Sequence, residues 1–77
     1  MLNGANKRPE SRFRDLILLT AREREVVQLV SSGLSNKLVA RNLGLREGTV
    51  KIHLHNVYRK LGIPNRMTLI ATGYWSS

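Results

Sequence analysis

Apolar residues recur at helical spacing through most of the chain, between residues that start and stop helices. The first such stretch opens with Thr20 and Glu23, which fit a capping box in which each side chain bonds the backbone N–H of the other. Gly33 can adopt the left-handed conformation that ends a helix. These signals predict a helix over about Ala21–Ser32, with an apolar face made by Val26, Val27, Leu29 and Val30.

A second, shorter helix is predicted between Ser35, which is a suitable N-cap, and Gly44, which stops it. Its apolar side carries Leu38, Val39 and Leu43. About three or four residues separate it from the next helix, which is the spacing of a helix-turn-helix. Many small helical proteins have short glycine turns, so the spacing needs support from the faces of the helices.

The third helix is predicted from about Glu47 to Leu61, because Gly62 ends it and Pro64 cannot continue it. Asn65 then caps a fourth helix, whose apolar residues are Leu69, Ile70 and Tyr74. Strand signals are nearly absent. The fold class is therefore predicted to be all-α, a four-helix bundle that contains a helix-turn-helix.

The third helix has two faces of different chemistry. At about 100° per residue, one arc of roughly 60° is apolar and is expected to face the core. It holds Val50, Leu54, Val57 and Leu61. The outward face is basic and hydrogen-bonding, with one aliphatic residue in its middle. It holds Lys51, Ile52, His55, Asn56 and Arg59. Such a face suits the major groove of DNA, which admits a helix and offers acceptors and thymine methyl groups.

Three of these residues are candidates for reading bases. Lys51 can donate to guanine O6 and N7, and Ile52 can contact a thymine methyl group. His55 can donate to a base or to a phosphate. Arg59 and Lys60, further along the helix, fit phosphate contacts better. Taken singly, Ile52 is also an ordinary exposed aliphatic residue, and the cations are also an ordinary solvated surface.

Contacts that position the protein on the DNA backbone are expected from residues around the outward face of the third helix. Lys37 and Arg41 lie on the short helix, and Lys37 is close to a helix N-terminus, which attracts anions. Thr49 lies in the first turn of the third helix. Its hydroxyl can bond a phosphate or serve the local cap, and both roles stay open. Asn56 is a further backbone candidate.

Composition and charge agree with a nucleic-acid partner. The 77 residues include 13 Lys and Arg against 5 Asp and Glu, a net charge of +8. This points to nucleic acid first and to an anionic membrane surface second. The longest apolar run, Leu16–Leu19, is far shorter than the roughly 20 residues that span a bilayer. A protein without a membrane partner, located in the cytoplasm, is therefore the default expectation.

Other functions find little support in the sequence. Cysteine is absent, which excludes disulfides and thiolate metal sites. His53 and His55 point about 200° apart on a helix and cannot share a metal. No motif joins Ser, His and Asp, so neither an enzyme nor a cofactor is expected. A module for RNA or anionic lipid is the main competitor. RNA modules usually display aromatic stacking platforms, however, and only Tyr58 among the aromatic residues lies in the third helix.

Residues 1–18 differ from the domain, assigned to 19–77. Asn3, Gly4, Pro9 and Ser11 are turn and linker residues, so a flexible arm or interdomain linker is expected here. The alternative is that the apolar residues of this stretch dock onto the domain. They are Phe13, Leu16, Ile17 and Leu18.

Several runs of the sequence resemble the LuxR/FixJ-type DNA-binding domain, and the match covers about residues 19–71. The runs are LTAREREVV at 19–27, GLSNKLVA at 33–40 and GTVKIH at 48–53, followed by Asn56, Lys60–Gly62 and Asn65–Arg66. The resemblance implies a helix-turn-helix over Asn36–His55 and a third helix that reads the major groove. Base contacts of the family fall on Lys51, Ile52 and His55.

The resemblance also implies partners. The fourth helix commonly mediates dimerisation, which makes Leu69, Ile70 and Tyr74 the candidates for a homodimer on double-stranded DNA. RNA polymerase is a further candidate partner. Family members are usually the output half of a larger regulator, so an output domain of a two-component response regulator is expected, with a small stand-alone regulator as the alternative.

Three positions depart from the family pattern. Arg46 stands where the family often has Ser or Thr as a helix cap, which predicts either a weaker cap for the third helix or compensation by Glu47 through the helix dipole. His55 stands where Lys or Arg is common. Leu69 replaces a residue that is often Ala, which predicts a bulkier dimer surface on the fourth helix.

Overall fold

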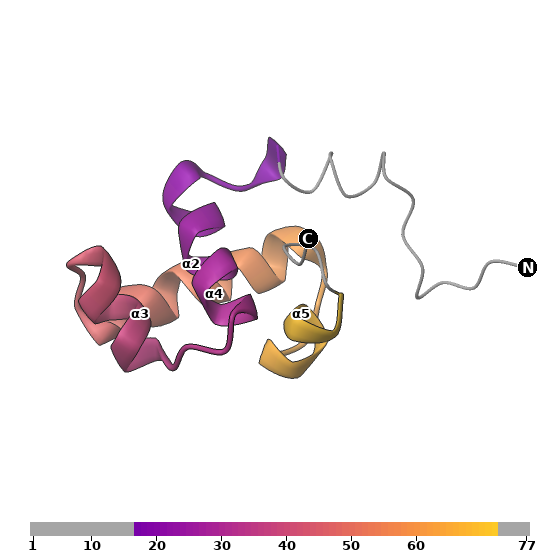
Figure 1. Ribbon diagram of the computed structural model, residues 1–77. Helices are drawn as coiled ribbons and strands as arrows, with labels where there is room; N and C mark the ends of the chain where they lie inside the picture. Colours follow the sequence, from indigo (N-terminus) through magenta and orange to yellow (C-terminus); the bar gives the residue numbers. More distant parts are fainter. Residues whose placement is uncertain (1–16, 73–77) are drawn as a thin grey trace, which may run out of the picture.

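Four helices follow one another in the part of the chain that the computed structural model describes, residues 17–72 (Figure 1). They are α2 (Ala21–Ser31), α3 (Asn36–Leu43), α4 (Glu47–Leu61) and α5 (Arg66–Thr72). This range contains no strand, so the all-α prediction is confirmed. Most of the predicted arm, residues 1–16, falls outside this range. Tyr74, one of the three dimer candidates, also falls outside it.

Short polar side chains begin three of the helices, as the sequence predicts. The Glu23 N–H donates to Thr20 Oγ1 over 3.1 Å, and the Thr20 N–H donates to Glu23 Oε1 over 2.9 Å, which completes the capping box of α2. The Leu38 N–H donates to Ser35 Oγ at the start of α3. The Thr68 N–H donates to Asn65 Oδ1 at the start of α5. Each bond satisfies an N–H that the helix itself leaves without a partner.

Glycines in the left-handed conformation end helices α3 and α4. Gly44 has φ 69° and Gly62 has φ 66°, values that an L side chain adopts only with strain. After each glycine the chain turns back, and the Ile63 N–H donates to Tyr58 O over 3.0 Å. Such a bond satisfies a carbonyl near the end of α4 and stops the helix there. Helix α2 ends at Ser31, one residue before the predicted end.

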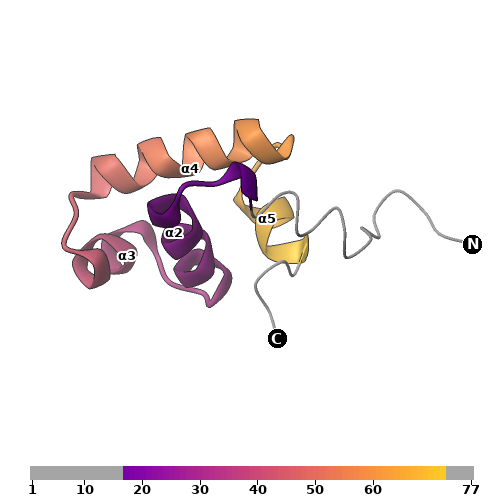
Figure 2. The same cartoon turned by 90° about the horizontal axis from the view of Figure 1, so that it is seen from above.

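Helix α4 is the centre of the packing. It packs against both α2 and α3, whereas α5 packs against α2. In Figure 2, α4 runs along one side of the molecule with α2 and α3 beneath it. The four residues of the predicted apolar arc of α4 are all buried: Val50, Leu54, Val57 and Leu61. The buried core is completed by Leu19, Val26, Val27, Val30, Val39, Ala40 and Leu69.

The start of α4 differs from the others. Arg46 occupies the N-cap position with extended backbone, and no side chain makes a cap hydrogen bond there. The weaker cap expected from Arg46 is therefore confirmed. Glu47 supplies one acidic side chain in the first turn, where it interacts favourably with the helix dipole.

No helix between residues 17 and 72 is both long enough and apolar enough to cross a membrane; the longest, α4, has 15 residues.

Candidate nucleic-acid interface

The outward face of α4 is available to a ligand. Lys51, Ile52 and His55 are all exposed, and the isoleucine keeps 63% of its surface open to solvent. The core holds α4 by its opposite side, so these side chains project from a helix that is fixed in place. The face carries a cation, an aliphatic group and an imidazole within two turns. That combination can meet guanine acceptors and a thymine methyl group in one groove.

The residues expected to contact the DNA backbone lie around this face, with one exception. Lys37 and Arg41 are exposed on α3, and Arg59 is exposed on α4. Thr49 and Asn56 are half-buried on α4. No side chain caps the start of α4, which leaves Thr49 without the local capping role considered for it.

Lys60 is the exception, because the structure gives it a partner within the domain. Its ammonium lies 2.7 Å from Glu23 Oε1, so it joins α4 to α2 instead of facing the outward side. The physical reason is its position on the helix, about 180° from Lys51. Glu23 is buried, with 3% of its surface exposed. Burial alone would raise the pKa of Glu23, but the bonds from Lys60 and Thr20 outweigh burial and hold that pKa below its usual range.

The dimer candidates on α5 need a correction. Leu69 is fully buried in the core, so the prediction that it forms a bulky dimer surface is wrong. Ile70 is 40% exposed and remains a candidate. The structure adds Met67, which is exposed on the same helix and which the sequence interpretation did not single out. A helix of only two turns shows too little periodicity to separate its inner and outer faces.

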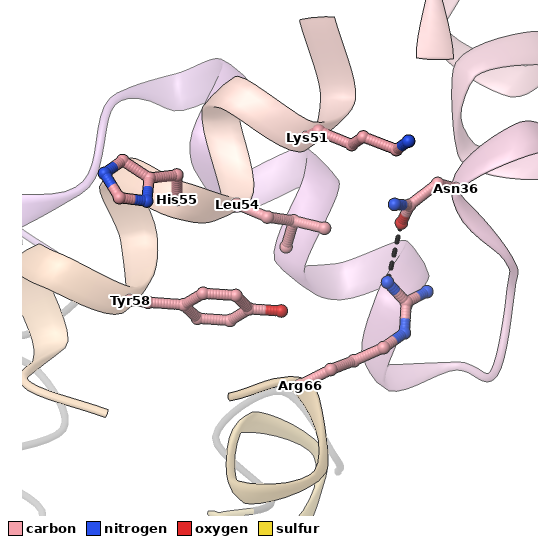
Figure 3. Close-up of a pocket in the computed structure, with 6 residues that line it drawn as sticks. All are labelled: Asn36, Lys51, Leu54, His55, Tyr58 and Arg66. Atoms are coloured by element: carbon pink, nitrogen blue, oxygen red, sulfur yellow. Dashed lines mark hydrogen bonds between the residues drawn. The ribbon is translucent and has the colours of Figure 1, made fainter. Parts of the chain in front are cut away.

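A cavity of about 310 Å³ opens beside the base-reading candidates (Figure 3). It lies between the start of α3, the middle of α4 and the start of α5. Its lining consists of Asn36, Lys51, Leu54, His55, Tyr58 and Arg66. Burial raises the pKa of the Tyr58 hydroxyl, and the charge of Arg66 opposes that effect only in part. The hydroxyl therefore stays protonated at neutral pH and can donate.

Arg66 makes two long-range hydrogen bonds at this cavity. Its Nη1 donates to Asn36 Oδ1 and its Nη2 donates to Leu34 O, each over 2.6 Å. These bonds tie the first residue of α5 to the start of α3. Sequence reasoning missed both Arg66 and Asn36 as candidate site residues, because their contact joins positions 30 residues apart.

Between residues 17 and 72, no group of three or more His, Cys, Asp or Glu side chains is placed to hold a metal ion.

Comparison with known families identifies the domain. Residues 18–72 match the family described as bacterial regulatory proteins, luxR family. The chain belongs to the luxR family. The resemblance inferred from the sequence motifs is thereby confirmed, and so is the helix-turn-helix fold. The luxR family is a family of DNA-binding transcription-regulator domains and is not an enzyme family.

The curated relatives that this chain matches are longer proteins. The monoamine regulon transcriptional regulator of Klebsiella aerogenes is 48% identical over 54 residues, which cover 70% of this chain and 24% of the relative. The nitrate/nitrite response regulator protein NarL of Escherichia coli (strain K12) is 41% identical over 54 residues, covering 70% of this chain and 25% of the relative. The luxR-family domain described here thus spans about a quarter of the length of these curated relatives.

Proposed function

We propose that the domain binds double-stranded DNA in a sequence-specific manner, with α4 in the major groove. The observation that carries the proposal is the exposed triplet of Lys51, Ile52 and His55 on the outer side of a helix whose other side is locked in the core. Lys51 reads a guanine, Ile52 contacts a thymine methyl group, and His55 donates to a base or a phosphate.

Backbone contacts fix the position of α4 in the groove. Lys37 and Arg41 on α3 and Arg59 on α4 neutralise phosphates, and Thr49 and Asn56 supply neutral donors. Each cation that pairs with a phosphate releases counterions, so binding weakens steeply as the salt concentration rises.

Selection from a randomised pool of DNA duplexes in about 0.15 M salt tests base reading, because charge contacts alone are weakened at that concentration. Enrichment of a short motif is the expected result. Binding without enrichment would show a basic surface that does not read sequence.

Two substitutions then separate the roles of the cations. Lys51→Ala should cost about 1–3 kcal/mol at one base position and relax the preference there. Lys37→Ala should weaken binding to all sequences alike and lower the salt slope by about 1. Arg22→Ala is the matched control, because this exposed cation lies on α2, outside the proposed interface. A change in base preference for Lys37→Ala would contradict its role as a phosphate contact.

Two copies are proposed to bind a repeated or inverted half-site as a homodimer. The exposed Met67 and Ile70 of α5 supply an apolar contact surface, and Tyr74 remains a candidate from the sequence alone. Sedimentation with a palindromic duplex tests this, and a strict one-to-one complex would refute it.

The larger protein is proposed to be a two-component response regulator that works in the cytoplasm, with this chain as its output domain and RNA polymerase as a partner. The support is the similarity to NarL, whose name describes a response regulator. A small stand-alone regulator is the alternative. The mass of the native protein distinguishes them, since an output domain is part of a protein well above the 8.7 kDa of these 77 residues, and a mass near that value would indicate a small stand-alone regulator.

A further inference from the structure

The cavity beside Lys51 carries positive charge and hydrogen-bond donors on its walls. Lys51 and Arg66 are cations, the Tyr58 hydroxyl can donate, and no acidic residue lines it. Its walls come from three segments, and one wall, the side of α4 with Lys51 and His55, is also part of the proposed reading face (Figure 3). Its chemistry suits an anion, and the anion nearest to a helix in the major groove is a phosphate of the DNA backbone.

Arg66 decides how the Asn36 amide is oriented. A guanidinium has only donors, so the Asn36 atom that faces it must be the oxygen. The bond of 2.6 Å from Arg66 Nη1 holds Oδ1 in that position, and the second bond to Leu34 O keeps the guanidinium in place. The Asn36 amide nitrogen is consequently turned away from Arg66. Figure 3 shows it on the side of the cavity where the Lys51 ammonium lies.

We propose that Asn36 donates its side-chain N–H to a DNA phosphate seated at this cavity, and that Arg66 is the positioning residue that orients the amide. The inference rests on the proposed function, because it requires α4 to lie in the major groove. The proposed phosphate lies in the DNA backbone, adjacent to the base that Lys51 reads. Asn36 adds no charge of its own, so it contributes a directional contact that fixes the register of the helix on the backbone.

The inference is tested with DNA in which single phosphates of the selected site are replaced, one at a time, by uncharged methylphosphonates. With the wild-type domain, one replacement next to the Lys51 base should weaken binding more than its neighbours. With Asn36→Ala that replacement should lose its extra effect. Asn36→Ala should itself bind natural DNA about tenfold more weakly on all sequences, as expected for a hydrogen bond to a charged group.

The salt dependence distinguishes Asn36 from a cation. Asn36→Ala should leave the slope of affinity against salt unchanged, whereas Lys37→Ala lowers it. Asn42→Ala is the matched control, because Asn42 is exposed near the other end of α3 and does not line the cavity. It should bind DNA as the wild type does.

Asn36→Asp guards against a purely structural effect, because it keeps the acceptor for Arg66 while it removes the N–H donor and adds a negative charge. Its melting temperature should not fall, yet its affinity should fall more than that of Asn42→Asp, which carries the same added charge on the same helix. Arg66→Lys keeps the charge but has one nitrogen in place of the two that bond Asn36 Oδ1 and Leu34 O. Made alone, Arg66→Lys should reduce the extra loss of affinity caused by the methylphosphonate next to the Lys51 base. Combined with Asn36→Ala, it should bring no further reduction.

The outcomes separate the two proposals. If the wild-type domain enriches no motif, the proposed function fails and no site exists to scan. If it does enrich a motif, and the methylphosphonate effects are the same in wild type and Asn36→Ala, the assignment of Asn36 is overturned while base reading stands. Equal losses for Asn36→Asp and Asn42→Asp would overturn it as well.

Discussion

The buried carboxylate of Glu23 is expected to be the most sensitive polar group of the domain. It accepts from the Thr20 N–H over 2.9 Å and from the Lys60 ammonium over 2.7 Å, and so closes the start of α2 and ties α2 to α4. Losing the capping bond from the Thr20 N–H costs about 1 kcal/mol in the free energy of unfolding. A hydrogen bond to a charged group is worth about 1.5–3 kcal/mol, and the lower end applies because the Lys60 side chain is 36% exposed.

Glu23→Ala should therefore lower the free energy of unfolding by about 2–3 kcal/mol. Glu23→Gln keeps an oxygen for Thr20 but loses the charge, and should cost about 1–2 kcal/mol. For a domain of this size each kcal/mol corresponds to about 4–8 °C in melting temperature, which thermal unfolding followed by circular dichroism resolves. Glu25→Gln is the matched control on the same helix. Glu25 pairs with Arg22 at 3.3 Å with both side chains well exposed, and should cost less than about 0.5 kcal/mol.

The pH dependence of the same variants gives the sharper test. The folded pKa of Glu23 lies below its ordinary value of 4.5, so the contribution of the carboxylate is complete above that value. It is lost as the pH falls through the lower, folded pKa. The difference in stability between wild type and Glu23→Gln should thus be constant near neutral pH and shrink below pH 4.5. A difference that persists undiminished into strong acid, or equal melting of Glu23→Gln and Glu25→Gln at pH 7, would refute the reasoning.

Four further substitutions on the other helices have defined outcomes in thermal unfolding. Arg46→Ser supplies the missing cap of α4 and should raise stability by about 1 kcal/mol; an unchanged melting temperature would contradict this. Gly48→Ala should raise it by up to about 1 kcal/mol, because an added Cβ meets nothing within 4 Å; a loss of stability would mean that the glycine is required by the fold. Leu69→Ala should cost about 2–5 kcal/mol, since the side chain is fully buried. Ile70→Ala should change stability by less than about 0.5 kcal/mol; similar losses for both would be inconsistent with the orientation of α5.

The local parts of this fold could be predicted because their signals are local. The Thr20–Glu23 capping box and the stop at Gly44 each depend on residues within one turn of one another. The two faces of α4 were predictable because the helix, at 15 residues, is long enough to show its period. These features gave the fold class and the outward position of Lys51, Ile52 and His55.

The sequence is less informative where a residue's partner is distant or its helix is short. The ion pair of Lys60 is not evident from the sequence, because its partner Glu23 is 37 residues away. The pairing of Arg66 with Asn36 is just as remote. Leu69 and Ile70 are neighbours on a helix of 7 residues, and only the packing of α5 against α2 decides which of them is buried.

The division of α4 into a buried stripe and an exposed face also bears on how such regulators diverge. Substitutions on an exposed helical face usually change stability by less than about 0.5 kcal/mol. Duplicated copies of the domain can therefore exchange Lys51, Ile52 or His55 for other side chains without risk to folding. The residues that anchor the helix, such as Val50 and Val57, are fully buried and cannot vary as freely. Within a single helix, selection can thus act on DNA preference at one set of positions while a separate set preserves the fold.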